Sequence, residues 1–252
     1  MSKNIKTFNV TLITQEPFRI GALKNVMSGE DNPVTTVGGR VVIQGSSLKG
    51  ALRANIEEYL VDKYSGDAVM KPCIPSAYNT LSPDEKRLID KGIYKTGGGC
   101  SYSSNPKNRS DSICPVCYLL GAQGLIGFVR VPYLYTDTRP EDMYAVRIDR
   151  GTGVVSEKTN RDFQIIADKI EFKGILEVIL NDTSKRWDFG KPRIVDHEQG
   201  LGVNDAWLKK DGWTQDKIIK EFIIDRLQTI QLMGGFKSKG CGKVKISVTE
   251  IQ

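Results

Sequence analysis

The sequence contains a single histidine, His197, among 252 residues. This scarcity excludes a ribonuclease that uses two histidines as acid and base, and also a metal site built on several histidines. Any catalysis would therefore depend on carboxylates, cations and a bound metal. Because His197 lies between Asp196 and Glu198, we expect it in an exposed polar loop.

Long hydrophobic runs are also missing. No stretch approaches the roughly 20 apolar residues of a transmembrane helix, and residues 1–6 lack the apolar core of a signal peptide. We therefore expect a cytoplasmic protein without a membrane partner. In that reducing compartment, the five cysteines favour metal ligands or free thiols over disulfides.

The charge balance allows a nucleic-acid partner without requiring one. The 36 Lys and Arg residues exceed the 30 Asp and Glu residues, which gives a net charge of +6. The length fits one elaborated domain over residues 1–252, and no repeat of fixed period is visible.

Apolar periodicity predicts an α+β fold. Alternation predicts strands, and helical spacing predicts helices. The predicted strands cover residues 6–14, 40–43, 128–135, 168–180 and 244–248, and the predicted helices cover residues 47–64, 84–91 and 214–230. This order fits a ferredoxin-like β-α-β-β-α-β sheet with large insertions.

A glycine–serine segment opens the first predicted helix. Ser46 and Ser47 are good N-cap residues, Gly45 permits close backbone approach, and Lys49 and Arg53 share one helical face. The free N–H groups of a first helical turn bind anions. The segment therefore favours phosphate binding, although ordinary capping and a surface ion pair would explain the same residues.

A second glycine-rich segment, residues 234–242, precedes the last predicted strand. Its glycines can bring backbone amides against phosphates, with lysines as counter-charges, although glycine is also the usual residue after a helix end. Together, the two segments favour a polynucleotide over a single nucleotide. The candidate phosphate-contacting residues of this loop are Gly234, Gly235, Lys237, Ser238 and Lys239.

Four of the five cysteines lie in residues 65–126, where no regular pattern is visible outside the predicted helix over residues 84–91. Cys114 and Cys117 form a CPVC pair, and Cys73 and Cys100 lie upstream. Four thiolates complete a closed tetrahedral site for structural zinc, which would stabilise this long insertion. Four unrelated thiols, or a redox pair, are the alternatives. The redox pair is disfavoured because no strand leads into the motif and no helical pattern follows it.

An acidic turn, residues 29–33, precedes the phosphate-binding segment. Pro33 keeps Asn32 extended, so the turn is not helical. Asp31 therefore supplies a carboxylate close to the predicted phosphate site.

Three parts of the sequence together resemble the RAMP proteins of CRISPR–Cas systems. They are residues 31–34 followed by 45–53, residues 148–153, and residues 234–242. The similarity is greatest to the Csm-type backbone subunit of type III effector complexes. It implies a modified RNA-recognition-motif fold that binds guide CRISPR RNA and stacks with neighbouring RAMP subunits and other effector-complex subunits.

The resemblance also implies an activity. A protruding thumb, residues 145–168, would interrupt the duplex of the guide with a single-stranded target RNA. Asp31 would be the catalytic residue, with Mg²⁺ or Mn²⁺, in cleavage through the neighbouring 2′-hydroxyl. Arg150 lies in the thumb, and Arg19 replaces a histidine of many relatives, so we expect both to contact RNA. Cys241 replaces an aromatic residue, and we leave it out of the zinc site.

Two alternatives to an RNA-guided endoribonuclease remain open. A non-catalytic RNA-binding scaffold of the same superfamily would need the binding elements but not Asp31. An endonuclease that processes precursor guide RNA would act without other subunits.

Overall fold

The computed structural model describes residues 4–21, 32–96, 99–103, 105, 110–145, 149–154, 161–196, 201–210 and 212–251. The strands are β1 (Asn4–Thr14), β2 (Thr36–Val37), β3 (Arg40–Ile43), β4 (Val129–Arg130), β5 (Leu134–Thr136), β6 (Glu141–Ala145), β7 (Arg161–Ile165), β8 (Glu171–Asp182), β9 (Trp187–Asp188), β10 (Ile194–Asp196), β11 (Leu201–Gly202) and β12 (Val244–Glu250). The helices are α1 (Gly45–Tyr64), η1 (Tyr78–Thr80), α2 (Pro83–Asp90), α3 (Pro115–Leu120), η3 (Ala206–Lys209), α4 (Gln215–Ile218), η4 (Ile219–Ile224), α5 (Asp225–Gln228) and η5 (Lys237–Lys239).

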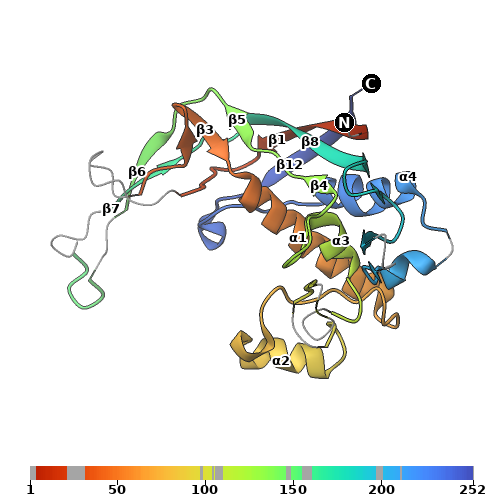
Figure 1. Ribbon diagram of the computed structural model, residues 1–252. Coiled ribbons are helices and arrows are strands. Elements are labelled where there is room, and N and C mark those ends of the chain that lie inside the picture. The colour runs from red at the N-terminus through yellow and green to blue at the C-terminus, as the bar shows by residue number, and fades with distance from the viewer. Residues whose placement is uncertain are drawn as a thin grey trace.

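An antiparallel sheet with the order β12-β1-β8-β5-β3-β2 forms the centre of the molecule. Alternation in β1 directs Phe8, Val10 and Leu12 into the core. In the register, Leu12 pairs with Phe172 of β8 and Ile246 of β12. Helices α1, α3 and α4 lie on one side of this sheet (Figure 1). The mixed α/β prediction is thus confirmed.

Helix α1 has its apolar residues at helical spacing, and Leu48, Leu52 and Ile56 are fully buried. Its N-cap is Gln44, which makes no side-chain capping bond, so the prediction that Ser46 or Ser47 caps the helix is wrong. Tertiary packing, rather than side-chain capping, determines where α1 begins. A Cβ on Gly45 would lie 2.9 Å from the carbonyl oxygen of Val131, so only glycine lets the helix approach that chain segment.

Two other elements differ in detail from those predicted from the sequence. Residues 128–135 form two short strands, β4 and β5, on either side of Pro132, which has no N–H to donate to a ladder. The last predicted helix is present, and Lys217 N–H donates to the capping Thr214 hydroxyl at 3.2 Å. Its middle, η4, is a π-helix, which the apolar spacing did not indicate.

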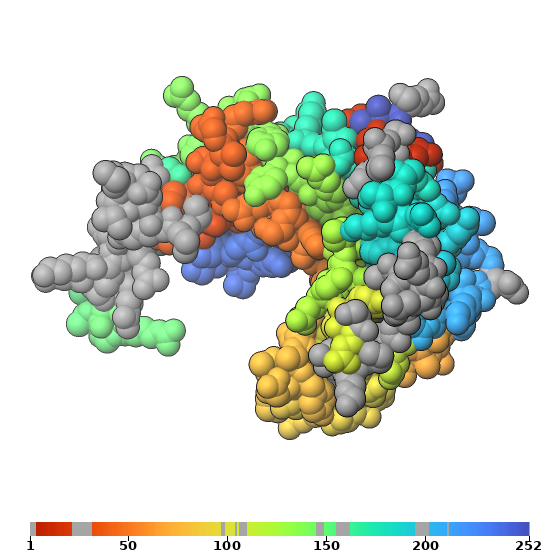
Figure 2. All heavy atoms as spheres, viewed as in Figure 1, coloured from red at the N-terminus to blue at the C-terminus, as the bar shows by residue number. Residues whose placement is uncertain are grey.

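The hairpin of β6 and β7 projects from one end of the sheet, and the part of the chain that contains α2 projects on the helical side, beyond α1 and α3 (Figure 1). Figure 2 shows a hollow between these two projections, with the segment that contains η5 at its edge. In the insertion, Ser82 and Glu85 form the capping box that begins α2. Within the described residues, no helix is long and apolar enough to cross a membrane.

A buried ion pair joins the segments that follow β9 and β11. Arg193 and Asp205 have fully buried side chains, and Arg193 Nη2 donates to Asp205 Oδ1 at 2.8 Å while Nε donates to Oδ2 at 3.1 Å. The guanidinium also lies 4.9 Å from the Tyr118 ring centroid. Neither charge has access to water, so each depends on the other.

We predict that Asp205→Asn destabilises the protein by about 3–5 kcal/mol, because it leaves the Arg193 charge buried without a counter-charge. Urea unfolding measures the change. Asp137→Asn is the control, since it breaks the exposed 2.8 Å pair with Arg40 and should cost about 1 kcal/mol or less. Equal effects of the two substitutions would contradict the prediction.

Candidate nucleic-acid interface and metal centre

A groove of about 700 Å³ lies between α1 and residues 229–237. It brings together five of the residues that the sequence suggested for phosphate binding. Alanine, glycine and serine on this face of α1 keep the groove open at the helix. The lining residues are Arg19, Ile20, Gly21, Ser47, Gly50, Ala51, Ala54, Asn55, Glu58, Thr229, Ile230, Gln231, Leu232, Met233, Gly234, Gly235 and Lys237.

Residues 17–21, here called the connector, run between the groove and the β6–β7 hairpin. Phe18 N–H donates to the Ile166 carbonyl at 2.8 Å, and Ile166 N–H donates back at 2.7 Å. On the glycine loop (residues 234–242), Gly235 N–H donates to the Arg19 carbonyl at 2.8 Å. The connector therefore fixes the hairpin and the glycine loop relative to each other.

The glycine loop requires glycine for two physical reasons. Gly234 has φ +83°, and a Cβ there would lie 2.5 Å from the Arg19 carbonyl oxygen. Gly242 has φ +98°, and its Cβ would lie 2.3 Å from the Met233 carbonyl oxygen. These glycines thus allow the backbone contacts that place the loop beside the connector.

Phe236 adopts the left-handed conformation with φ +60°, which is unfavourable for a bulky residue. Its ring centroid lies 5.1 Å from that of Phe163 in β7, and the Arg19 guanidinium lies 4.9 Å from it. Lys239 Nζ lies 4.8 Å from the same centroid. Such strain, of order 1–3 kcal/mol, is typical of functional sites. Phe236 has no signal of its own in the sequence, because a backbone angle leaves no pattern there.

Arg19 combines partial burial with an incompletely bonded guanidinium. Its Nε is buried and has no hydrogen-bond partner among the described residues, and Nη2 donates to the Asn32 carbonyl at 3.5 Å. Burial lowers the pKa of this guanidinium. An anion bound in the groove would offset that loss of hydration, as the predicted phosphate contact requires.

The predicted catalytic residue, Asp31, lies outside the described residues, but the next residue, Asn32, is hydrogen-bonded to β7. Gln164 N–H donates to the Asn32 carbonyl at 3.0 Å, and Asn32 Nδ2 donates to the Asp162 carbonyl at 3.1 Å. Gln164 Oε1 also accepts from Val34 N–H at 3.2 Å. Strand β7 therefore anchors the end of the acidic turn. Neither Asn32 nor Gln164 was identified from the sequence as a site residue.

Lys49 and Arg53 do not line the groove. Lys49 is exposed beside a second cavity, of about 460 Å³, next to α3. Arg53 is 17% exposed and donates to Glu57 Oε1 at 3.3 Å and to the Gly121 carbonyl at 3.1 Å. The shared face that the spacing predicted is thus directed toward α3 and the cysteines.

The remaining predicted RNA-contacting residues lie outside the groove lining. Gly45 is buried against the chain, and Ser46 is exposed in the first turn of α1. Ser238 and Lys239 are exposed in η5, next to the groove, and Arg150 is exposed in the part of the hairpin loop that the structure describes.

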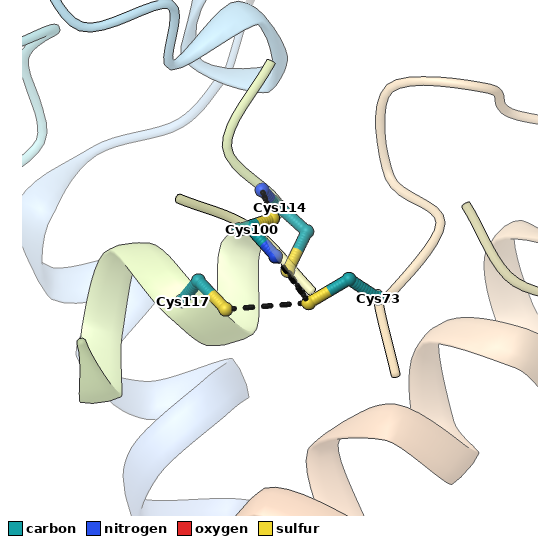
Figure 3. Close-up of side chains that lie close together, drawn as sticks. All are labelled: Cys73, Cys100, Cys114 and Cys117. Atoms are coloured by element: carbon teal, nitrogen blue, oxygen red, sulfur yellow. Dashed lines mark hydrogen bonds between the residues drawn. The ribbon is translucent and has the colours of Figure 1, made fainter. Parts of the chain in front are cut away.

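Four cysteines that are distant in sequence come together, as predicted. The sulfurs of Cys73, Cys100, Cys114 and Cys117 lie within 4.8 Å of one another, and all four residues are buried (Figure 3). The Cys73–Cys117 and Cys73–Cys114 sulfur separations are 3.4 and 3.8 Å. Tetrahedral zinc, with Zn–S of about 2.3 Å, requires sulfurs about 3.8 Å apart. The donor set therefore fits a metal such as zinc.

Backbone donors and helix geometry support the same cluster. Cys100 N–H donates to Cys73 Sγ at 3.3 Å, and Cys114 N–H donates to Cys100 Sγ at 3.4 Å. Cys114 is the N-cap of α3, so a short helix begins within the CPVC motif, contrary to expectation. Hydrogen bonds from Cys114 and the other thiols lower the pKa of Cys100, and hydrogen bonding to Cys100 raises the pKa of the other three.

A family model of the RAMP superfamily matches residues 11–245, which include the connector, the glycine loop and all four cysteines. No curated protein matches the chain.

We predict that the purified chain contains one zinc ion and that Cys114→Ser with Cys117→Ser removes it and lowers the unfolding temperature. Because protons compete for thiols of raised pKa, zinc affinity should fall as the pH falls. Elemental analysis and thermal unfolding measure these effects. Cys241→Ser is the control, since Cys241 is buried outside the cluster. A wild-type chain without stoichiometric metal would contradict the prediction.

Proposed function

Since the match covers residues 11–245, the chain belongs to the RAMP superfamily, and we propose that it is a guide-RNA-binding backbone subunit of a type III CRISPR effector complex. Superfamily membership indicates a CRISPR-associated, RNA-binding protein that acts in a multi-subunit complex. The finer assignment depends on the groove, where the connector, the glycine loop and α1 meet beside the residue that follows Asp31.

The sheet supports this proposal. Strands β12, β1, β8 and β5 are adjacent and antiparallel, with α1 between β1 and β5 in the chain and α4 to α5 between β8 and β12. This is the order that we expect of a ferredoxin-like, modified RNA-recognition-motif domain. The cysteine-bearing insertion and the β6–β7 hairpin are additions to it, and we assign the hairpin to the thumb.

The groove suits a ribose-phosphate chain. Arg19 can bind a phosphate with its planar guanidinium, and Lys237 supplies a second cation from η5. Ser47 and the glycine loop offer small side chains and close backbone approach. Contacts of this kind hold the backbone and carry no sequence information, as a subunit that accepts many guide sequences requires.

Cleavage of the target strand is the second part of the proposal. Asp31 would supply the carboxylate, next in the chain to the anchored Asn32, and a target nucleotide held apart by the thumb could place its 2′-hydroxyl in line with the phosphate. Bound Mg²⁺ or Mn²⁺ would supply positive charge for the attacked phosphate. The strand that anchors Asn32, β7, belongs to the thumb. The same strand would therefore contribute to target binding and hold the end of the acidic turn.

We assign zinc in the four-cysteine cluster a structural role. Four protein sulfurs fill a tetrahedral site and leave no position for water or substrate. The cluster links the chain on both sides of α2 to α3. Between these points, the described chain contains only short helices. Neighbouring RAMP subunits and other complex subunits are the proposed protein partners.

We predict that Lys237→Ala weakens guide-RNA binding similarly for unrelated sequences and lowers the salt slope of log affinity by about one, as loss of one phosphate contact does. Binding titrations at several salt concentrations measure both effects. Lys91→Ala, an exposed lysine after α2, is the control and should leave the slope unchanged. A change confined to one guide sequence would contradict backbone binding.

We predict that Asp31→Ala lowers the cleavage rate of complementary RNA by the assembled complex about 10²–10⁴-fold, because it removes a positioned carboxylate. Assembly and target binding should be retained. Single-turnover cleavage and target titrations measure the two properties, with Asp90→Ala, an exposed α2 carboxylate, as the control.

Three results would overturn parts of this assignment. Unchanged cleavage by the Asp31→Ala complex would exclude the catalytic role. A wild-type complex that binds target and never cleaves it would identify a scaffold subunit. Specific cleavage of repeat RNA by the chain alone would identify a guide-processing enzyme.

A further inference from the structure

Arg53 contacts the cysteine cluster directly. Both of its Nη atoms lie 3.8 Å from Cys117 Sγ, within the range of N–H···S bonds, and Nη2 also donates to the Gly121 carbonyl at 3.1 Å. Nη1 reaches Glu57 at 3.3 Å. The side chain thus crosses from α1 to α3 with its planar end against a predicted metal ligand. The Arg53 guanidinium, which the sequence suggested for phosphate binding, is therefore in contact with sulfur instead.

A second cation contacts another ligand of the cluster. Lys95 Nζ is 3.9 Å from Cys100 Sγ and also donates to the Ser112 carbonyl. Four thiolates with one divalent zinc carry two net negative charges, which are costly in a buried site unless they are compensated. Arg53 and Lys95 provide two positive charges in contact with two different ligands.

A cavity of about 350 Å³ reaches this cluster from outside. Its wall includes Arg53, Cys100, Cys117 and Gly121. A metal site needs an entry path as well as ligands. The Arg53 guanidinium lies at the point where this cavity meets the Cys117 sulfur.

We propose that Arg53 is a positioning residue of the metal centre: its guanidinium holds the Cys117 thiolate and restricts exchange of the metal through the adjoining cavity, while Lys95 balances the remaining charge. Outer contacts of this kind orient a ligand and stabilise its charged form. Helix α1 therefore contributes one face to the groove and a different face to the metal centre. This inference is independent of RNA cleavage.

The test compares zinc transfer from the full-length, zinc-loaded chain to a chromogenic chelator. Arg53→Met keeps an unbranched, apolar stem and removes the guanidinium with its charge and donors. We expect its zinc affinity to fall about 10–100-fold, with faster release. Arg53→Lys should recover part of the loss, because it restores charge without the two-pronged contact. Lys49→Met, one turn away on the same face and exposed, should behave as wild type.

Further variants keep the test decisive. Glu57→Gln, alone and with Arg53→Met, separates the sulfur contact from the cost of an unpaired Glu57, and the double variant should still release zinc faster. If Arg53→Met does not fold, Arg53→Lys and Lys95→Met provide the comparison, each with intermediate release. Wild-type release rates in Arg53→Met, or equal losses in Lys49→Met, would overturn the proposal. Zinc release is measured without RNA, so failure here is distinct from failure of the proposed function.

Discussion

Main-chain hydrogen bonds along both edges of the connector organise the candidate RNA site. The connector bonds to the hairpin through Phe18 and Ile166, and to the glycine loop through the Arg19 carbonyl. Backbone groups in such a position must be paired, so a shift of one residue would leave several buried donors and acceptors without partners. The arrangement of groove, thumb and acidic turn therefore depends on this short segment more than on any single side chain.

Helix α1 separates the two candidate sites. Its small residues face the groove, its leucines fill the core, and Arg53 reaches the cysteine cluster. One helix can do this because its side chains project in all directions around a rigid axis. A motif that reads as one phosphate-binding unit along the chain is thus divided between two sites in space.

Strain and desolvation are concentrated beside the groove. Phe236 has a left-handed backbone, and Arg19 has a buried nitrogen with no partner among the described residues. Both are unfavourable in the free protein, and the surrounding structure must compensate for them. Away from the groove, the buried Arg193–Asp205 pair joins the segments that follow β9 and β11, and the four-cysteine cluster can join its own segments when it holds a metal.

The main elements and the cysteine cluster are predictable from the order of the residues alone. Apolar spacing located β1 and α1, Thr214 marked the start of the last helix, and the cysteines had the spacing of a metal site. Three features could not be predicted without the folded chain: Arg53 turns toward Cys117, Gln164 anchors the acidic turn, and Gly45 packs on Val131. The physical reason is that periodicity fixes which residues share a face. What packs against that face depends on contacts between residues far apart in the chain.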